Sequence, residues 1–200
     1  MPAQKNTHAL AVAAMLSAVA FVLMFLELPI PALVPPFIKL DVSDLPELLA
    51  AFALGPLWGA LVALMKNVLF LLLHGTSSSY AGELCNFLFG AVFACTAGAV
   101  YRRHKTRRRA LLGAILGAAA MALLSLPLNY YVVYPVYARV FAPMEAILAA
   151  YQALLPAADT LWKCLLFFNL PFTFGKGLLD VGLCFLIYKP LSPLLHSKKS

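Results

Sequence analysis

The chain has 200 residues, of which 63% are hydrophobic and only 12% charged, and its mean hydropathy is +0.89. A soluble domain carries about 25% charged residues, so this composition excludes a soluble enzyme, a disordered chain and a DNA-binding domain, despite the net charge of +7. At roughly 20 apolar residues per membrane-spanning helix, the length allows about six spans in one all-α membrane domain covering 1–200. The four cysteines lie apart within apolar runs, which favours buried thiols over a disulfide framework or a metal site.

Apolar runs bounded by proline, glycine and polar residues predict the helices in chain order. Proline cannot continue a helix, so the prolines within 29–36 end the first, and Pro127 predicts a kink in the fifth. The second is only about ten residues long before Gly55, and we expect it to be half-buried or tilted. Asn169 followed by Pro171 is typical of a helix start. The six predicted helices are 8–28, 45–54, 57–74, 82–101, 110–137 and 170–188.

Basic residues gather on one side of this six-helix arrangement. They lie before the first helix, between the fourth and fifth, and after the last: Lys5, Arg102, Arg103, Lys105, Arg107, Arg108, Arg109, Lys189, Lys198 and Lys199. By the positive-inside rule this side is cytoplasmic, which explains the basic run without a nucleic-acid partner. The segments 29–44, 75–81 and 138–157 then lie outside and hold most of the loop polarity, which suggests that the protein takes up something from outside.

Polar residues inside the predicted spans are candidates for function, because ionisable groups there cost about 2.5–3.5 kcal/mol each at mid-bilayer. At about 1.5 Å of rise per residue, five of them share one depth just beneath the outer loops. They are Glu83, Asn86, Asn129, Thr173 and Lys176. This shared depth predicts a binding site that opens outward.

Structural explanations compete for most of these residues. Glu83 is favourable near a helix N-terminus whatever else it does. Lys176 and Asp180, four positions apart, can neutralise each other, and Lys66 can hydrogen-bond between helices. The tyrosines around Tyr130 can form an aromatic belt at the membrane surface. Asn129, which lies among leucines, a proline and tyrosines, has the weakest structural explanation.

The first helix carries small residues at four-residue spacing, which lets another helix approach closely in lipid. They are Ala9, Ala13, Ala14, Ser17 and Ala18, and they predict either a partner interface or internal packing. The chain has no GxxxxGK[ST], HExxH or GxSxG motif and no obvious internal repeat. We therefore expect a protein that is not an enzyme, has no catalytic or metal-binding residues, and depends on a partner for energy.

Several stretches together resemble the riboflavin-specific S components of energy-coupling factor (ECF) vitamin transporters. The more specific are LDVSDLPELL at 40–49 and GELCNFLFG at 82–90. The others, in order across nearly the whole chain, are 15–23, 52–56, 62–67, 128–130, 135–137 and 170–177.

This resemblance implies a six-helix fold in a bacterial cell membrane, with riboflavin as the transported ligand and no cofactor. It also implies assembly with a membrane coupling subunit and two ATPase subunits, with the small-residue surface facing the coupling subunit. In the family, Asn129 and Lys176 match positions that hydrogen-bond the flavin ring. Thr173 stands where the family pattern has asparagine, so the polar edge of the ring is held differently, and the preferred flavin can differ.

Riboflavin needs stacking side chains, a polar contact for the ring edge and polar groups for its hydroxylated tail. Phe37, Tyr130 and Phe172 can stack, Asn129 and Lys176 can bind the edge, and the first loop can bind the tail. The candidate binding residues are Leu40, Asp41, Glu83, Asn86, Asn129, Tyr130, Phe172, Thr173 and Lys176. The alternatives are an S component for another vitamin or flavin derivative and, from a different class, a stand-alone facilitator or a membrane enzyme.

Overall fold

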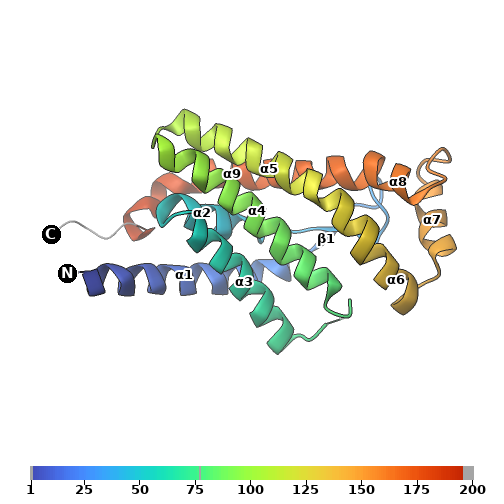
Figure 1. Ribbon diagram of the computed structural model, residues 1–200, viewed down its shortest axis with the longest axis horizontal. Coiled ribbons are helices and arrows are strands. Elements are labelled where there is room, and N and C mark those ends of the chain that lie inside the picture. The colour runs from blue at the N-terminus through green and yellow to red at the C-terminus, as the bar shows by residue number, and fades with distance from the viewer. Residues whose placement is uncertain (1, 77, 196–200) are drawn as a thin grey trace.

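The computed structural model describes residues 2–76 and 78–195. Lys198 and Lys199 lie outside the described residues, as do the side chains of Lys5 and Lys189. The protein is an elongated helical bundle (Figure 1). Its elements are α1 (Pro2–Met24), β1 (Leu28–Pro29), β2 (Lys39–Leu40), α2 (Leu45–Ala53), α3 (Pro56–Leu73), α4 (Ala81–Arg103), α5 (Arg107–Leu128), η1 (Asn129–Val133), α6 (Tyr134–Val140), α7 (Met144–Gln152), α8 (Leu161–Cys164), η2 (Leu165–Asn169) and α9 (Leu170–Leu195).

Within the described residues, five helical segments are long and apolar enough to cross a membrane: Thr7–Met24, Pro56–Leu73, Ala81–Arg103, Arg107–Val140 and Leu161–Tyr188. The predicted short second helix corresponds to α2, whose nine residues extend about 14 Å and cannot cross a hydrocarbon core of about 30 Å. The membrane domain is thus all-helical, apart from the two-residue strands. Part of the predicted outer segment 138–157 is also helical, as α7.

Two of the spans continue through a π-helical turn that the sequence analysis did not identify. In η1 the amide of Tyr134 donates to Asn129 O, and in η2 the amide of Leu170 donates to Leu165 O. Each turn is followed by a proline at the second position of the next helix, Pro135 or Pro171. A proline ring crowds the carbonyl one turn earlier, and a widened turn relieves that crowding. The last span therefore begins at Leu161, and Asn169 lies inside it.

The short helix α2 is enclosed by its neighbours. Eight of its nine residues are buried, including Glu47. Gly55, with a φ of 122°, makes the tight link to α3. Gly90 on α4 gives α2 its space, because a Cβ atom there would overlap the Glu47 carboxylate. Packing against α1, α3, α4 and α9 replaces the lipid contact that a spanning helix would have.

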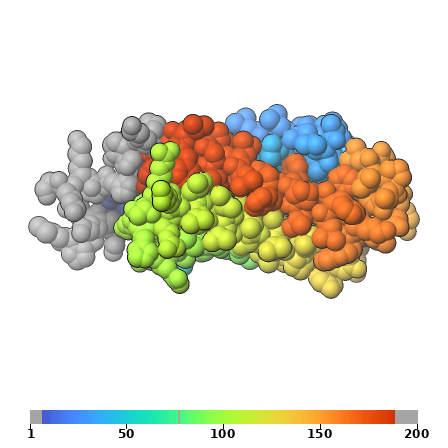
Figure 2. All heavy atoms as spheres, turned by 90° about the horizontal axis from the view of Figure 1, so that it is seen from above, coloured from blue at the N-terminus to red at the C-terminus, as the bar shows by residue number. Residues whose placement is uncertain are grey.

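The two ends of the bundle differ in construction. The first residues of α1, the last turns of α9 and the basic link between α4 and α5 lie at one end (Figure 1). The α3–α4 link and the elements from α6 to α8 lie towards the other end. The loop from β1 to Asp44 runs beside α9, next to the segment that holds α7 and α8 (Figure 2). The β1–β2 pairing, Leu28 with Leu40 and Pro29 with Lys39, closes this loop on itself.

Candidate functional site

A cavity of about 200 Å³ lies between the first loop and helices α4, α5, η1, η2 and α9. It borders both buried apolar clusters of the bundle, since Met121 belongs to one cluster and Val133 and Tyr134 to the other. The residues around it are Phe37, Ile38, Lys39, Asp41, Asp44, Asn86, Phe89, Met121, Asn129, Val133, Tyr134, Tyr137, Asn169, Phe172, Thr173 and Lys176.

The cavity brings together six of the nine candidate binding residues, namely Asp41, Asn86, Asn129, Phe172, Thr173 and Lys176. Two of them have unused hydrogen-bonding capacity. Asn129 is 9% exposed, yet neither its amide nor the Thr173 hydroxyl makes a hydrogen bond to the part of the chain that the structure describes. Buried polar groups are normally satisfied, so both side chains have the properties of ligand contacts.

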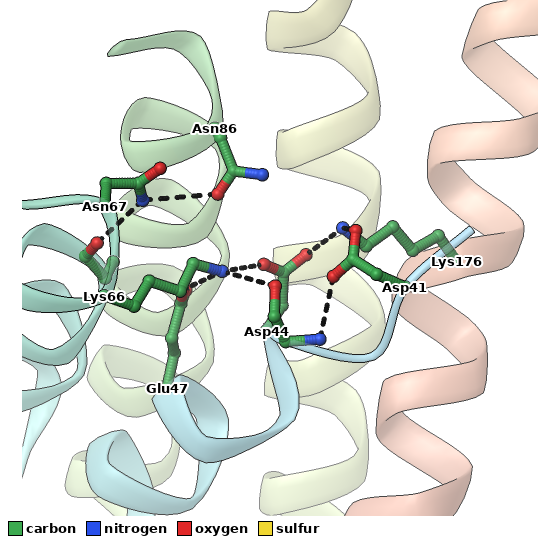
Figure 3. A network of polar contacts seen from close by, with 9 residues as sticks. Asp41, Asp44, Glu47, Lys66, Asn67, Asn86 and Lys176 are labelled. Atoms are coloured by element: carbon green, nitrogen blue, oxygen red, sulfur yellow. Dashed lines mark hydrogen bonds and ion pairs between the residues drawn. The ribbon is translucent and has the colours of Figure 1, made fainter. Parts of the chain in front are cut away.

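A network of ion pairs forms the floor of this site (Figure 3). Lys66, fully buried on α3, donates to Asp44 Oδ1 at 2.6 Å and to Ser43 Oγ at 2.9 Å, and its Nζ lies 2.5 Å from Glu47 Oε1. Lys176 on α9 lies 2.9 Å from Asp41 Oδ2 and 3.0 Å from Asp44 Oδ2. Asp44 thus uses one carboxylate oxygen for each lysine and joins α3 to α9.

The positive charges of the two lysines keep the carboxyl groups of the loop ionised. Burial alone would raise the pKa of Asp41 and of Asp44, because desolvation disfavours the charged form. The ammonium groups of Lys176 and Lys66 outweigh this effect and hold the pKa of both carboxyls below its usual range. Both aspartates are therefore anionic at neutral pH, and each lysine is compensated from within the protein.

Lys176 does not pair with Asp180 in the structure, although the two are four positions apart in the sequence. No ion pair joins them among the described residues, and Lys176 extends towards the loop instead (Figure 3). Asp180 is fully buried, and neither of its carboxyl oxygens has a hydrogen-bond partner within that part of the chain. Lys66 does have the structural role proposed for it, although it pairs with carboxylates of the loop and α2.

Three of the candidate residues lie away from the cavity wall. Glu83 accepts hydrogen bonds from Ser78 at 2.5 Å and Thr76 at 3.1 Å, so it orders the link before α4. Tyr130 is 37% exposed and packs edge-on against Trp162, which agrees with its interpretation as part of an aromatic belt. Leu40 lines a neighbouring cavity of about 340 Å³ that also includes Phe172 and Lys176.

Asn169 is a residue of the cavity wall that the sequence did not predict. The amide lines the cavity from the end of η2 and is 7% exposed. An asparagine two residues before Pro171 is typical of a helix start, so the sequence predicts Asn169 at a helix boundary. Once the span is known to begin at Leu161, Asn169 is a polar residue within the membrane, the same signal that identified Asn129.

The small residues of α1 fall on two faces. Ala13 and Ser17 are 4% and 3% exposed, and Ser17 donates to Ala13 O at 2.8 Å. Their assignment to a partner interface is therefore corrected, because they pack inside the bundle against α2 and α3. Ala9 is half-buried, and only Ala14 and Ala18 are exposed.

Comparison with known proteins supports one family over nearly the whole chain. The riboflavin transporter RibU of Staphylococcus aureus (strain TCH60) is 35% identical over 192 residues, which cover 96% of this chain and 94% of that protein. The riboflavin transporter FmnP of Bacillus subtilis (strain 168) is 31% identical, with coverage of 96% and 95%.

A solved structure described as the S component of a bacterial ECF transporter superposes with a TM-score of 0.73 at 33% identity. It covers 96% of this chain and 99% of its own. The family described as "ECF transporter, substrate-specific component" matches residues 8–188. On this evidence the chain belongs to the substrate-specific components of ECF transporters.

Proposed function

We propose that this protein binds riboflavin in the cavity beneath the first loop and presents it for ATP-driven uptake. The observation that carries the proposal is the wall of that cavity, where three asparagine amides, the Thr173 hydroxyl and two lysines lie among aromatic side chains. The names of the relatives point to the same ligand.

The shape of the site suits a molecule with a flat ring and a hydroxylated tail. The inner cavity carries Asn129, Thr173 and the aromatic side chains of Phe172 and Tyr134. A second cavity of about 460 Å³ shares the Lys39, Asp41 and Asn86 part of the wall and adds Glu27. We place the flavin ring in the inner cavity and the ribityl chain, with its hydroxyl groups, in the more polar outer one.

The proposal includes a topology in a bacterial cell membrane. The end that carries the α4–α5 link is cytoplasmic, because Arg102 to Arg109 form the densest positive charge of the chain. With α2 counted as the short second of six helices, the cavity then opens towards the outside.

We further propose that a membrane coupling subunit and two ATPase subunits supply the energy. No GxxxxGK[ST] motif occurs in the 200 residues, so this chain does not hydrolyse ATP by that route. The exposed pair Ala14 and Ala18 on α1 allows a partner helix to approach closely.

The test is a titration of purified protein in detergent with riboflavin, followed by the intrinsic fluorescence of the flavin. We expect saturable quenching at one site per chain, with thiamine and biotin unable to displace the ligand. A parallel titration with FMN determines whether Thr173 accompanies a preference for the phosphorylated flavin. Absence of saturable binding, or displacement by another vitamin at lower concentration, would overturn the proposal.

A further inference from the structure

Asn169 is part of a closed ring of three hydrogen bonds on the wall of the cavity. Tyr151 Oη donates to Asn169 Oδ1 at 2.7 Å, and Asn169 Nδ2 donates to Tyr134 Oη at 3.0 Å. The two tyrosine hydroxyls are themselves hydrogen-bonded. Each of the three groups donates once and accepts once, so the ring fixes the plane of the amide.

This ring uses only half of what the amide can do. A side-chain amide has two N–H donors and two acceptor lone pairs on its carbonyl oxygen. The ring takes one donor and one acceptor, and it leaves one of each on a residue that is 7% exposed. A buried polar group without partners is costly, so this residual capacity requires a ligand or an ordered water.

The direction of the unused groups follows from where the ring lies. Tyr151 is fully buried in the apolar cluster behind the cavity, and it is not part of the cavity wall. Asn169 is part of that wall and precedes Thr173 by four residues, which places the two on one helix face. The residual donor and acceptor of Asn169 therefore join the unpartnered groups of Thr173 and Asn129 around the same space.

We propose that Asn169 is a specificity-determining contact for the polar edge of the flavin ring, held in position by Tyr134 and Tyr151. The inference rests on the proposed function, because it concerns the same cavity and ligand. The pyrimidine edge of a flavin offers an N–H donor between two carbonyl acceptors. A fixed amide with one free donor and one free acceptor complements that pattern, and Tyr151 acts as a positioning residue that does not touch the ligand.

The experiment measures the dissociation constants of riboflavin and of 3-methylriboflavin, in which the ring-edge N–H is blocked. The proteins are the wild type, Asn169→Leu and Tyr151→Phe. Ser125→Ala is the matched control, because it removes a buried polar group of α5 that bonds only within its own helix. Thermal unfolding of each protein without ligand measures the structural effect separately.

We expect Asn169→Leu to weaken riboflavin binding roughly ten- to hundred-fold and to reduce the preference for riboflavin over its methylated analogue. Tyr151→Phe should produce a smaller loss in the same direction, and Ser125→Ala should change neither quantity. An unchanged dissociation constant in Asn169→Leu overturns the inference. So does weaker binding with an unchanged preference and a lower melting temperature, which would assign Asn169 to structure alone. Failure of the wild type to bind riboflavin is a different result, since it overturns the proposed function and the inference with it.

Discussion

Asp41 and Lys176 lie 135 positions apart in the sequence, and their side chains meet at 2.9 Å. This pair fastens the first loop to the last helix at the wall of the cavity. Because Lys176 is already compensated by Asp41 and Asp44, a neutral ligand can accept a hydrogen bond from it without bringing a counter-charge. This agrees with an uncharged vitamin as the transported molecule.

Replacement of Asn129 is expected to affect binding without affecting stability. Its amide makes no hydrogen bond within the described residues, so Asn129→Leu removes no hydrogen bond from that part of the protein. We expect roughly a ten- to hundred-fold weaker affinity for riboflavin and an unchanged melting temperature. The control is Asn67→Leu, which deletes hydrogen bonds to Ala63 O and Asn86 Oδ1 and should lower the melting temperature. Full affinity in Asn129→Leu would remove this residue from the site.

Replacement of Lys66 is expected to destabilise the protein strongly. Lys66→Met leaves Glu47 buried without its cation and Asp44 with Lys176 alone, and loss of one partner of a buried pair costs about 3–5 kcal/mol of unfolding free energy. Lys163→Met is the control, because its pair with Asp159 is exposed to solvent and should have no measurable effect. The measurement is denaturant unfolding in mixed micelles. Equal stabilities of the two variants would contradict this account of the network.

The contribution of Asp44 should depend on pH in one direction. An aspartate of the unfolded chain titrates near pH 4, whereas Lys176 and Lys66 lower the pKa of Asp44 in the folded protein. The contribution of the Asp44 carboxylate to the unfolding free energy is therefore complete above about pH 4, and it is lost as the pH falls through the lowered pKa. The difference in melting temperature between wild type and Asp44→Asn should be constant from about pH 7 to pH 5 and shrink below about pH 4. A difference that widens with acidification would show that the sign is wrong.

The space left by the helical glycine Gly90 should matter more than that left by Gly182. A methyl group at Gly90 displaces the Glu47 carboxylate from its place beside Lys66, so Gly90→Ala is expected to cost about 1–3 kcal/mol of unfolding free energy. Gly182→Ala is the matched change, because a Cβ atom there meets nothing within 4 Å, and it should be neutral or slightly stabilising. Denaturant unfolding compares the two variants. An unchanged unfolding free energy in Gly90→Ala would contradict this prediction, because it would mean that α2 can move to make room for the methyl group.

Bulky residues on the exposed face of α1 should separate binding from transport. With Ala14 and Ala18 both replaced by Trp, the isolated protein is expected to bind riboflavin normally, because these side chains lie on the outer face of α1. Uptake of labelled riboflavin by cells that express the coupling proteins should fall to the level without those proteins. Leu123→Trp, at an exposed position on α5, is the control and should transport normally. Full uptake by the double variant would place the interface elsewhere.

Most of the fold could be predicted from the sequence, because long apolar runs bounded by proline and charge leave few alternatives to membrane helices. The shortness of α2 was also predictable, but its enclosure was not, since the sequence predicted a half-buried or tilted helix and eight of its nine residues are buried. The π-helical turns were not, since the prolines that accompany them also occur at helix starts. Because of that ambiguity the predicted last span is too short, and it leaves out Asn169.

The site was predictable as a depth but not as a set of contacts. Rise per residue places Asn86, Asn129, Thr173 and Lys176 at one level, and the cavity brings these four together. Rotation about each helix axis is decided by packing, which the spacing of single polar residues does not determine. Glu83 and Tyr130 share that level and nevertheless point elsewhere, and Lys176 pairs with a loop that is distant in sequence.

The enclosure of α2 has a consequence for how the chain is inserted into the membrane. A segment of nine residues preceded by Asp44 and containing Glu47 is too short and too acidic to leave a translocation channel by itself. Among the described residues, the Glu47 carboxylate forms its ion pair with Lys66 of the next helix. We therefore expect α2 and α3 to enter the bilayer as one hairpin, with Gly55 as its turn. The Lys66 half of the cavity floor can then form before α9, which brings Lys176, has been synthesised.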